Sequence, residues 1–134
     1  READAERVLR HALSLQPDAA AIRHALGLSL IRQKRYDEAL QQLKRATEGA
    51  PDAARYAYVY AVALRSMGGA DAARSFVDEA LKRLPNDPGL LELALGDALT
   101  SGDAAKAAPL AARLSAMRPD DANLARTAAM LQRR

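Results

Sequence analysis

Few side chains in this sequence could carry out chemistry. Its 134 residues contain no cysteine, which excludes disulfides, thiolate nucleophiles and zinc sites built on sulfur. The two histidines, His11 and His24, form neither a His-Glu-x-x-His pair nor a His-rich tract. A metal site would therefore need carboxylates from other parts of the chain. We expect His24 to be a polar side chain on the surface or in a groove, without a metal-binding or acid–base role.

The hydroxyl groups and glycines give no stronger sign of catalysis. None of the serines lies in a nucleophile elbow, and a serine hydroxyl without a nearby base is a poor nucleophile. The pair Gly68-Gly69 lacks both the length and the following Lys-Ser/Thr of a phosphate-binding loop. The sequence therefore predicts a protein that is not an enzyme and that needs no cofactor or metal. The serines are Ser14, Ser29, Ser66, Ser75, Ser101 and Ser115.

Charge and hydropathy narrow the classes of partner. The formal net charge is +3, and the basic residues are spread along the chain, so we expect no nucleic-acid partner. No run of about 18 apolar residues exists, which predicts no membrane insertion. Residues 1–4 lack the pattern of a signal peptide, so no leader is expected. Both a cytoplasmic and a periplasmic location are compatible with these features.

Composition favours helices as the elements that position these side chains. The chain contains 32 Ala and 20 Leu, against 4 Val and 2 Ile. Ala and Leu have high helix propensity, whereas sheets draw on β-branched and aromatic residues. We therefore predict an all-α fold of about 8 helices.

The prolines show an internal repeat of 34 residues. Pro17, Pro51, Pro85 and Pro119 are evenly spaced, and each is followed by Asp or Asn. Alanines keep the same period, and several such columns in one register indicate a true repeat. The alanine column is Ala5, Ala39, Ala73 and Ala107.

Each repeat is predicted to contain two amphipathic helices. Apolar residues recur at helical spacing on both sides of short breaks at 33–36, 68–70 and 101–103. We expect the Asp or Asn after each repeat-ending proline to cap the next helix, and glycines to permit the turn within a repeat. The final helix, with its Gln132-Arg133-Arg134 end, suits a polar cap whose cations face the negative end of the helix dipole.

Small and large residues alternate across the predicted helix pairs. Gly27 and Ala61 fall on first helices where small residues allow close approach, while Leu43 belongs to a column of large residues. The third repeat has Leu95 at the position of Gly27 and an alanine-rich second helix, which predicts an exchange of volume. Pro109 predicts a kink or a late helix start in that second helix.

The repeat as a whole resembles the tetratricopeptide repeat family, and we interpret the chain as a single domain of a bacterial member. We expect residues 1–17 to be the second helix of an incomplete repeat, 18–51, 52–85 and 86–119 to be full repeats, and 120–134 to be a capping helix. The resemblance is carried by Leu26-Gly27, Tyr36-Asp37-Glu38-Ala39, Leu43, Ala46 and Pro51 in the first full repeat and by Tyr60, Gly68, Ala73, Ala80 and Pro85 in the second.

This resemblance implies a right-handed superhelical solenoid of antiparallel helix pairs, with first helices lining a concave groove. It further implies a scaffold that binds a peptide or protein segment in that groove. The groove positions of the family correspond to His24, Leu28, Ile31, Arg32, Arg55, Tyr58, Val62, Arg65, Glu92 and Leu99.

Other interpretations remain open. Tyr58 points away from Tyr56 and Tyr60, which we assign to the core, but it could also be merely an exposed tyrosine. The arginines could be solvated surface charges. The repeats could instead be a structural spacer, or could form a homo-oligomer through the helix within 1–17, whose apolar face lacks a preceding helix. That face is formed by Ala5, Val8, Leu9, Ala12 and Leu13.

Overall fold

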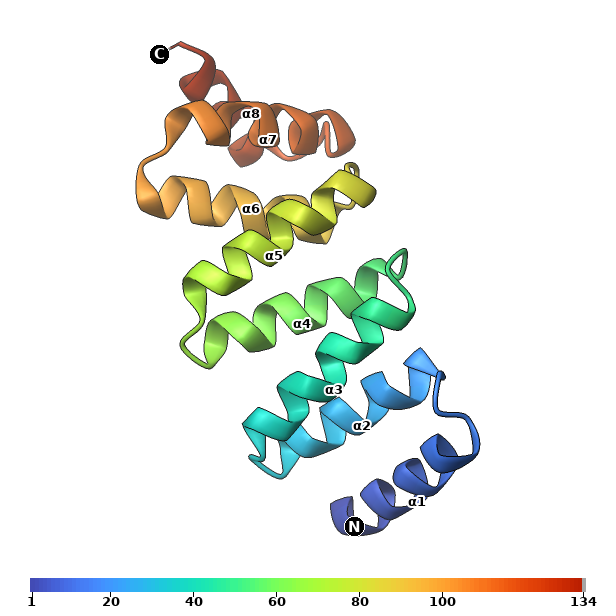
Figure 1. The fold of residues 1–134 in the computed structure, drawn as a ribbon. Coiled ribbons are helices and arrows are strands. Elements are labelled where there is room, and N and C mark those ends of the chain that lie inside the picture. Colours follow the sequence, from blue (N-terminus) through green and yellow to red (C-terminus); the bar gives the residue numbers. More distant parts are fainter. Residues whose placement is uncertain (134) are drawn as a thin grey trace. The chain divides into compact units, whose positions relative to one another are not determined.

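The computed structural model describes residues 1–133, which form eight α-helices and no strand (Figure 1). The predicted all-α fold is confirmed. The chain forms two compact units, an N-terminal unit, Arg1–Ala73, and a C-terminal unit, Arg74–Arg134. The boundary falls within α5. The helices are α1 (Glu2–Leu15), α2 (Ala20–Arg32), α3 (Tyr36–Gly49), α4 (Ala54–Ser66), α5 (Ala70–Arg83), α6 (Pro88–Ser101), α7 (Ala104–Met117) and α8 (Ala122–Gln132).

The turns within the repeats share one backbone conformation. Gly68 and Gly102 adopt positive φ angles of 91° and 75°, as expected for glycines that reverse the chain. The first repeat makes the same turn with Lys34, at a φ of 61°. The turn is therefore a property of the repeat, and it forms even where a residue with a Cβ must adopt the left-handed conformation.

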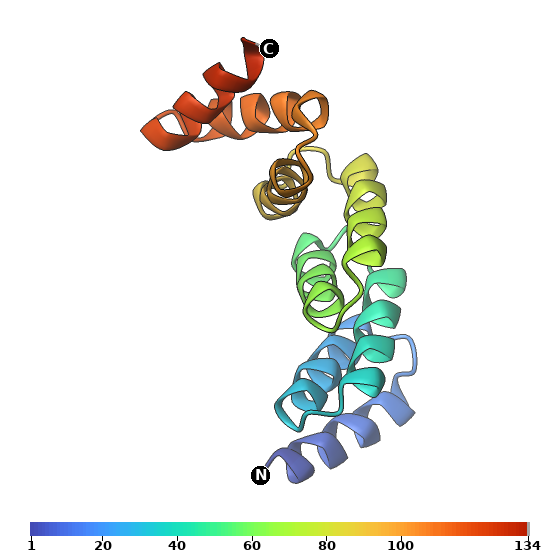
Figure 2. The same ribbon diagram turned by 90° about the vertical axis from the view of Figure 1, so that its left-hand side faces the viewer.

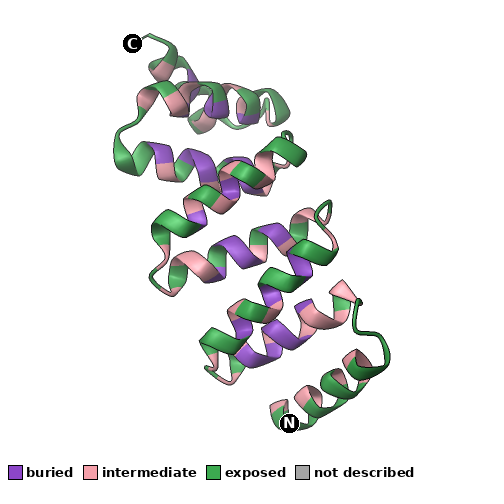
Figure 3. Ribbon diagram, in the orientation of Figure 1, coloured by how far each residue is buried: buried purple, intermediate pink, exposed green. Residues whose placement is uncertain are grey.

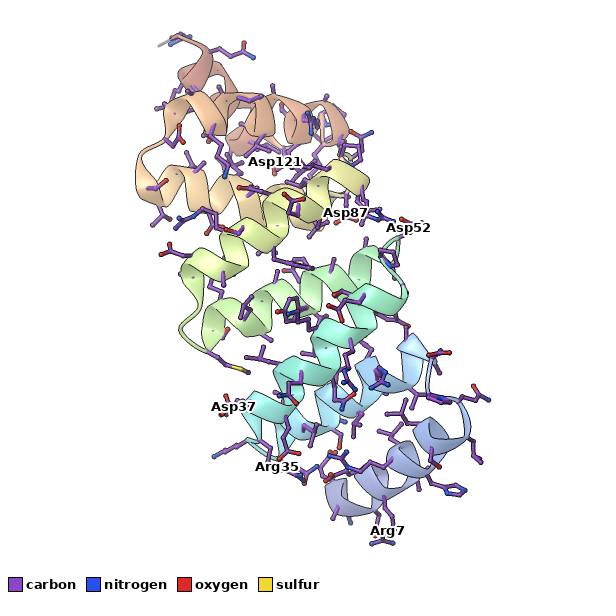
Figure 4. All side chains as sticks on the ribbon, in the orientation of Figure 1. Arg7, Arg35, Asp37, Asp52, Asp87 and Asp121 are labelled. Carbon is purple, nitrogen blue, oxygen red and sulfur yellow. The ribbon has the colours of Figure 1, made fainter. Side chains whose placement is uncertain are left out.

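The helix caps differ from the expectation by one residue. Asp87 and Asp121 are the N-caps of α6 and α8, and their carboxylates accept from the backbone amides three residues later, at 3.0 Å (Figure 4). The residue directly after the proline lies in the turn instead, because two residues are needed between the proline and the first helical turn. Ala19 and Ala53 stand at the equivalent N-caps of α2 and α4 and provide no side-chain acceptor.

The core of the N-terminal unit lies between α2 and α3, which pack side by side (Figures 1 and 2). Leu26, Leu30 and Leu43 are fully buried there. Figure 3 colours parts of both helices as buried. A Cβ atom on Gly27 would lie only 2.7 Å from Cγ of Leu43. Gly27 therefore permits the close approach of the two helices, as its small size predicts.

The core of the C-terminal unit lies between α6 and α7, and α8 packs against α7. Leu95 of α6 and Ala111 of α7 are both buried, so the large residue now lies on the first helix of the pair. The burial of a large residue on α6 and a small one on α7 agrees with the expected exchange of volume.

Pro109 does not delay the start of α7. The helix begins at Ala104, and the Asp103 carboxylate caps it by accepting from the Lys106 amide at 3.0 Å. Pro109 and Ala105, whose carbonyl it deprives of a hydrogen bond, are both exposed, so water can satisfy that carbonyl. The expectation of a late start was therefore wrong. At the other end of the unit, Arg133 is the C-cap of α8, and Arg134 lies outside the described residues.

Candidate functional site

One face of α4 carries apolar and basic side chains, of which Arg55, Tyr58 and Val62 are exposed and Arg65 is half-buried. Arg55, Tyr58, Val62 and Arg65 follow each other at intervals of three or four residues, and we call this set the α4 stripe. Tyr58 is 39% exposed and Val62 36% exposed. The other face of the same helix is buried through Ala57, Tyr60 and Ala61. The packing of that face orients the stripe outward.

Tyr60 lies in the core, as predicted. Its side chain is buried, and burial together with the negative charge of Glu48 raises the pKa of its hydroxyl. Tyr56 is only half-buried. The predicted core position is therefore confirmed for Tyr60 but only partly met by Tyr56, which contacts α2.

That contact places His24 inside the N-terminal unit. The imidazole is only 6% exposed and stacks on Tyr56 of α4 with ring centroids 4.4 Å apart. Within residues 1–133, neither ring nitrogen has a hydrogen-bond partner. Burial, reinforced by the positive charge of Arg55, lowers the pKa of His24. An exposed surface position for His24 is therefore wrong, because the ring of Tyr56 stacks on the imidazole, while its assignment to the groove stays a prediction.

The remaining predicted residues of α2 are partly used within the fold. Leu28 and Ile31 are half-buried, and Ile31 packs against the cluster of Leu26, Leu30 and Ala39. Arg32 donates from Nε to the Glu2 carboxylate of α1 at 2.7 Å. Its charge is therefore already balanced within the unit.

Glu2 is one of the residues of α1 whose polar contacts hold this helix against α2 and the residues that follow it. We call these contacts the polar attachment of α1, and no sequence pattern predicted them. The Glu2 carboxylate also accepts from the hydroxyl of buried Ser29 at 3.0 Å, and hydrogen bonds from Arg32 and Ser29 lower the pKa of Glu2. Glu6 accepts from Arg35 at 2.6 Å and from the amide of Gln33 at 3.2 Å. The residues joined by these hydrogen bonds are 27 to 29 positions apart in the sequence, so no local pattern indicates them.

The same attachment extends to the start of α3. Arg35, labelled in Figure 4, pairs through Nη2 with Glu38 at 2.7 Å, and Arg10 pairs with both Glu6 and Glu38. The hydrogen bond from Arg10 is the main cause that lowers the pKa of Glu6. Leu9 and Leu13 add apolar contacts with the cluster around Leu26. Within Glu2–Leu15 no side chain is fully buried, so polar contacts form a large part of how α1 is held.

The two predicted groove residues of the C-terminal unit have different surroundings. Glu92 of α6 is paired with Arg118. Leu99 is 47% exposed and lines a pocket of about 280 Å³, which we call the C-terminal pocket. The pocket lies where the end of α6, the start of α7 and the end of α8 meet. Its lining includes Leu99, Gly102, Ala104, Thr127, Met130 and Leu131.

Met130 was missed, although the repeat contained a signal for it. It stands 68 residues after Val62 and 102 after Leu28, and thus at the same repeat position as two predicted groove residues. Met130 is 64% exposed. Extending the groove columns into the last helix would have identified it.

The described residues include no metal centre. Among residues 1–133, no group of three or more His, Asp or Glu side chains is placed to hold a metal ion. Over the same residues, no helix has the length and apolar character needed to cross a membrane. What α4 and the C-terminal pocket can offer chemically is apolar contact area beside arginines that can pair with carboxylates.

Comparison with solved structures shows the same fold in proteins of low sequence identity. YrrB, described as a TPR protein with an unusual peptide-binding site, has a TM-score of 0.73 at 18% identity, over 97% of this chain and 67% of YrrB. A MamA structure has a TM-score of 0.73 at 15% identity, covering 96% of this chain and 75% of MamA. MamA from Desulfovibrio magneticus RS-1 gives 0.71 at 12%, covering 97% and 73%.

Sequence comparison assigns the family. No curated protein matches the chain. The family model for the tetratricopeptide repeat matches residues 3–50 and 24–88, which together span more than half of the chain. With the 34-residue period and the paired helices, this match shows that the chain belongs to the tetratricopeptide repeat family.

Proposed function

We propose that the chain is a non-catalytic scaffold that binds a peptide or an extended segment of a partner protein, with the α4 stripe as part of the binding surface. One observation carries the proposal: α4 exposes Tyr58 and Val62 beside arginines, while Ala57, Tyr60 and Ala61 bury the opposite face of the helix. Tyrosine and arginine are enriched among the residues that dominate binding energy at protein interfaces.

The surroundings of α4 are consistent with this role. The stack of His24 on Tyr56 joins α2 to α4, so the predicted groove residues of both helices belong to adjoining helices of one unit. Arg55 is exposed, and its planar guanidinium can pair with a carboxylate of a ligand. The peptide-binding site named for the structurally similar YrrB supports a peptide as the class of ligand.

The test begins with peptides selected from a displayed random library on the intact chain. Affinity for a selected peptide is then measured by fluorescence anisotropy. We expect Tyr58→Ala to weaken binding by about tenfold or more, because a central aromatic residue is lost. Arg55→Glu should weaken binding of acidic peptides most.

A matched control separates the stripe from aromatic surface in general. Tyr36 of α3 is 43% exposed, close to the 39% of Tyr58, but lies outside the stripe. Tyr36→Ala should leave the affinity unchanged. Equal losses for the two tyrosine variants, or failure to select any peptide, would count against the proposal.

Self-association through α1 is a second candidate function. Val8 is 68% exposed and Leu15 is 70% exposed, and apolar groups of this kind can pair with another copy. Leu9 and Leu13, in contrast, already pack within the unit. Sedimentation equilibrium at several concentrations should detect a dimer that Val8→Glu abolishes. A strict monomer at all concentrations would exclude this alternative.

A further inference from the structure

We propose that the C-terminal pocket takes up one large apolar side chain from a peptide whose neighbouring residues are acidic. This inference rests on the proposed function and names the class of peptide that a second surface of the chain would select. It concerns α6, α7 and α8 only, so the pocket can be tested independently of the α4 stripe.

The pocket is open because small residues stand at its α6–α7 turn. Gly102 and Ala104 occupy the repeat positions that hold Lys34 and Tyr36 in the first full repeat, each exactly two periods earlier in the repeat register. A tyrosine at position 104 would add a large ring at the edge of the pocket. The second repeat also has Gly68 and Ala70 at these positions, so small turn residues alone do not make the cavity, which forms where this turn lies against the end of α8.

The size and lining of the pocket fit a side chain. Its volume of about 280 Å³ lies just below the range of about 300–1,000 Å³ that is typical of small-molecule and cofactor sites. Leu99 and Met130 are exposed at its edge by 47% and 64%. A leucine, isoleucine or phenylalanine from a peptide would cover both, and methionine adapts its shape readily to such a guest.

The charge beside the pocket favours acidic neighbours. Arg126 and Arg133 lie four residues before and three residues after Met130, so all three share one face of the α8 end. Arg126 donates to the neutral amide oxygen of Asn123, a partner that does not balance its positive charge. Carboxylates on either side of the inserted apolar residue could pair with these guanidinium groups.

The acidic groups of the unit limit where those carboxylates can lie. Glu92 is already paired with Arg118. Asp103, next to the pocket residues Gly102 and Ala104, uses its carboxylate to cap α7. Its negative charge would repel an acid at the α7 side, so the acidic residues of the peptide should face α8.

The methionines allow a direct measurement of pocket occupancy. The chain has 3 methionines, and Met67 and Met117 lie outside the pocket lining. We would label the methionine methyl groups isotopically and titrate the full chain with blocked tripeptides of sequence Glu-Leu-Glu, Lys-Leu-Lys and Glu-Gly-Glu. Glu-Leu-Glu should shift the Met130 signal saturably, severalfold more tightly than Lys-Leu-Lys, while Glu-Gly-Glu should have no effect.

Two sets of variants test the geometry and the charge. Ala104→Tyr should reduce binding of Glu-Leu-Glu by about tenfold or more, because the new ring obstructs the cavity. Ala70→Tyr makes the same substitution at the same repeat position of the second repeat and should have no effect. The double variant Arg126→Glu and Arg133→Glu should reverse the preference toward Lys-Leu-Lys without preventing folding, since both residues are exposed.

Several results would overturn the proposal. These are an unmoved Met130 signal, equal shifts at all three methionines, or the same affinity in Ala104→Tyr. A Met130 signal that depends on protein concentration without peptide would assign the pocket to a second copy instead. If Tyr58-dependent binding of selected peptides persists while Met130 stays silent, only the pocket proposal fails. If no peptide is selected but the tripeptides bind at Met130, the α4 proposal fails and the pocket stands.

Discussion

The N-terminal and C-terminal units build the same helix pair with opposite distributions of volume. In the N-terminal unit, Gly27 on the first helix faces Leu43 on the second, and the missing side chain admits the leucine. In the C-terminal unit, Leu95 occupies the position of Gly27, and the second helix presents buried Ala111 at the position of Leu43. At this pair of positions, a large residue on one helix goes with a small residue on the other in both units, whichever helix carries the large one.

The largest effect on stability is expected when the two residues of the N-terminal contact are replaced by those of the C-terminal one. Leu43→Ala removes a fully buried side chain and should lower the free energy of unfolding by about 2–5 kcal/mol. Gly27→Leu should cost about 1–3 kcal/mol or more through overpacking. In the double variant the new leucine can fill the space left by the old one, so the loss should be clearly smaller than the sum of the two.

Tyrosine fluorescence during urea unfolding is a suitable measurement. All 4 tyrosines lie in the N-terminal unit, and the chain contains no tryptophan that would dominate the signal. Additive losses in the double variant would show that the two positions do not exchange volume.

A second difference between the units lies in their helix caps. Asp87 and Asp121 cap α6 and α8, whereas Ala19 and Ala53 begin α2 and α4 with similar extended backbone angles. Ala19→Asp should therefore raise the free energy of unfolding by about 1 kcal/mol, and Asp87→Ala should lower it by about the same amount. Chemical denaturation followed by circular dichroism would measure both. Ala19→Ser should reproduce the gain, and a loss in both aspartate and serine variants would contradict it.

A pH-dependent difference is expected from His24, which belongs to the N-terminal unit only. Because its folded-state pKa is lowered from the ordinary value of 6.5, the unfolded chain binds the proton more tightly. The contribution to stability is therefore complete above pH 6.5 and decreases as the pH falls below it. Tyrosine fluorescence unfolding curves between pH 8 and 5 (spanning roughly the histidine range) would measure the loss.

Two variants identify the group responsible. His24→Phe retains a ring to stack on Tyr56 and should remove the dependence in this pH range. The exposed His11 of α1 provides the control, and His11→Gln should leave the dependence intact. An unchanged slope in His24→Phe would assign the titration to other groups.

Much of the fold followed from local patterns in the sequence. The helical spacing of apolar residues and the 34-residue period predicted eight helices and the turns at Gly68 and Gly102, because both depend on neighbouring residues. The caps were displaced by one residue, because the pattern gives the turn but not the dihedral angles at its end. The Lys34 turn shows the same limit, since a lysine carries no local preference for positive φ.

The candidate site was less predictable because it depends on contacts between helices. The groove positions implied by the family resemblance included the exposed Tyr58 and Val62, but His24 is buried in a stack with Tyr56 of another helix, which no local pattern indicates. The pairing of Arg32 with Glu2 joins residues 30 positions apart, and no local pattern indicates it. Met130 could have been predicted, because the 34-residue period alone places it at the repeat position of the predicted groove residues Leu28 and Val62.

The smallest expected effect concerns the polar attachment of α1, which the apolar helix pairs do not share. Glu2 and Glu6 have lowered pKa values, so their contribution is present above about pH 4.5 and is lost as the pH falls through the lower folded-state values. Glu2→Gln should speed hydrogen exchange of α1 amides without changing that of α3, because exposed ion pairs add little to global stability. Added salt should also speed hydrogen exchange of the α1 amides in the unmodified chain, and it should speed it less in Glu2→Gln.

Asp4→Asn removes an acid of α1 whose partner, Arg7, lies on the same helix, and serves as the control. Equal acceleration by Glu2→Gln and Asp4→Asn would mean that helix propensity, and not attachment to α2, governs the opening of α1.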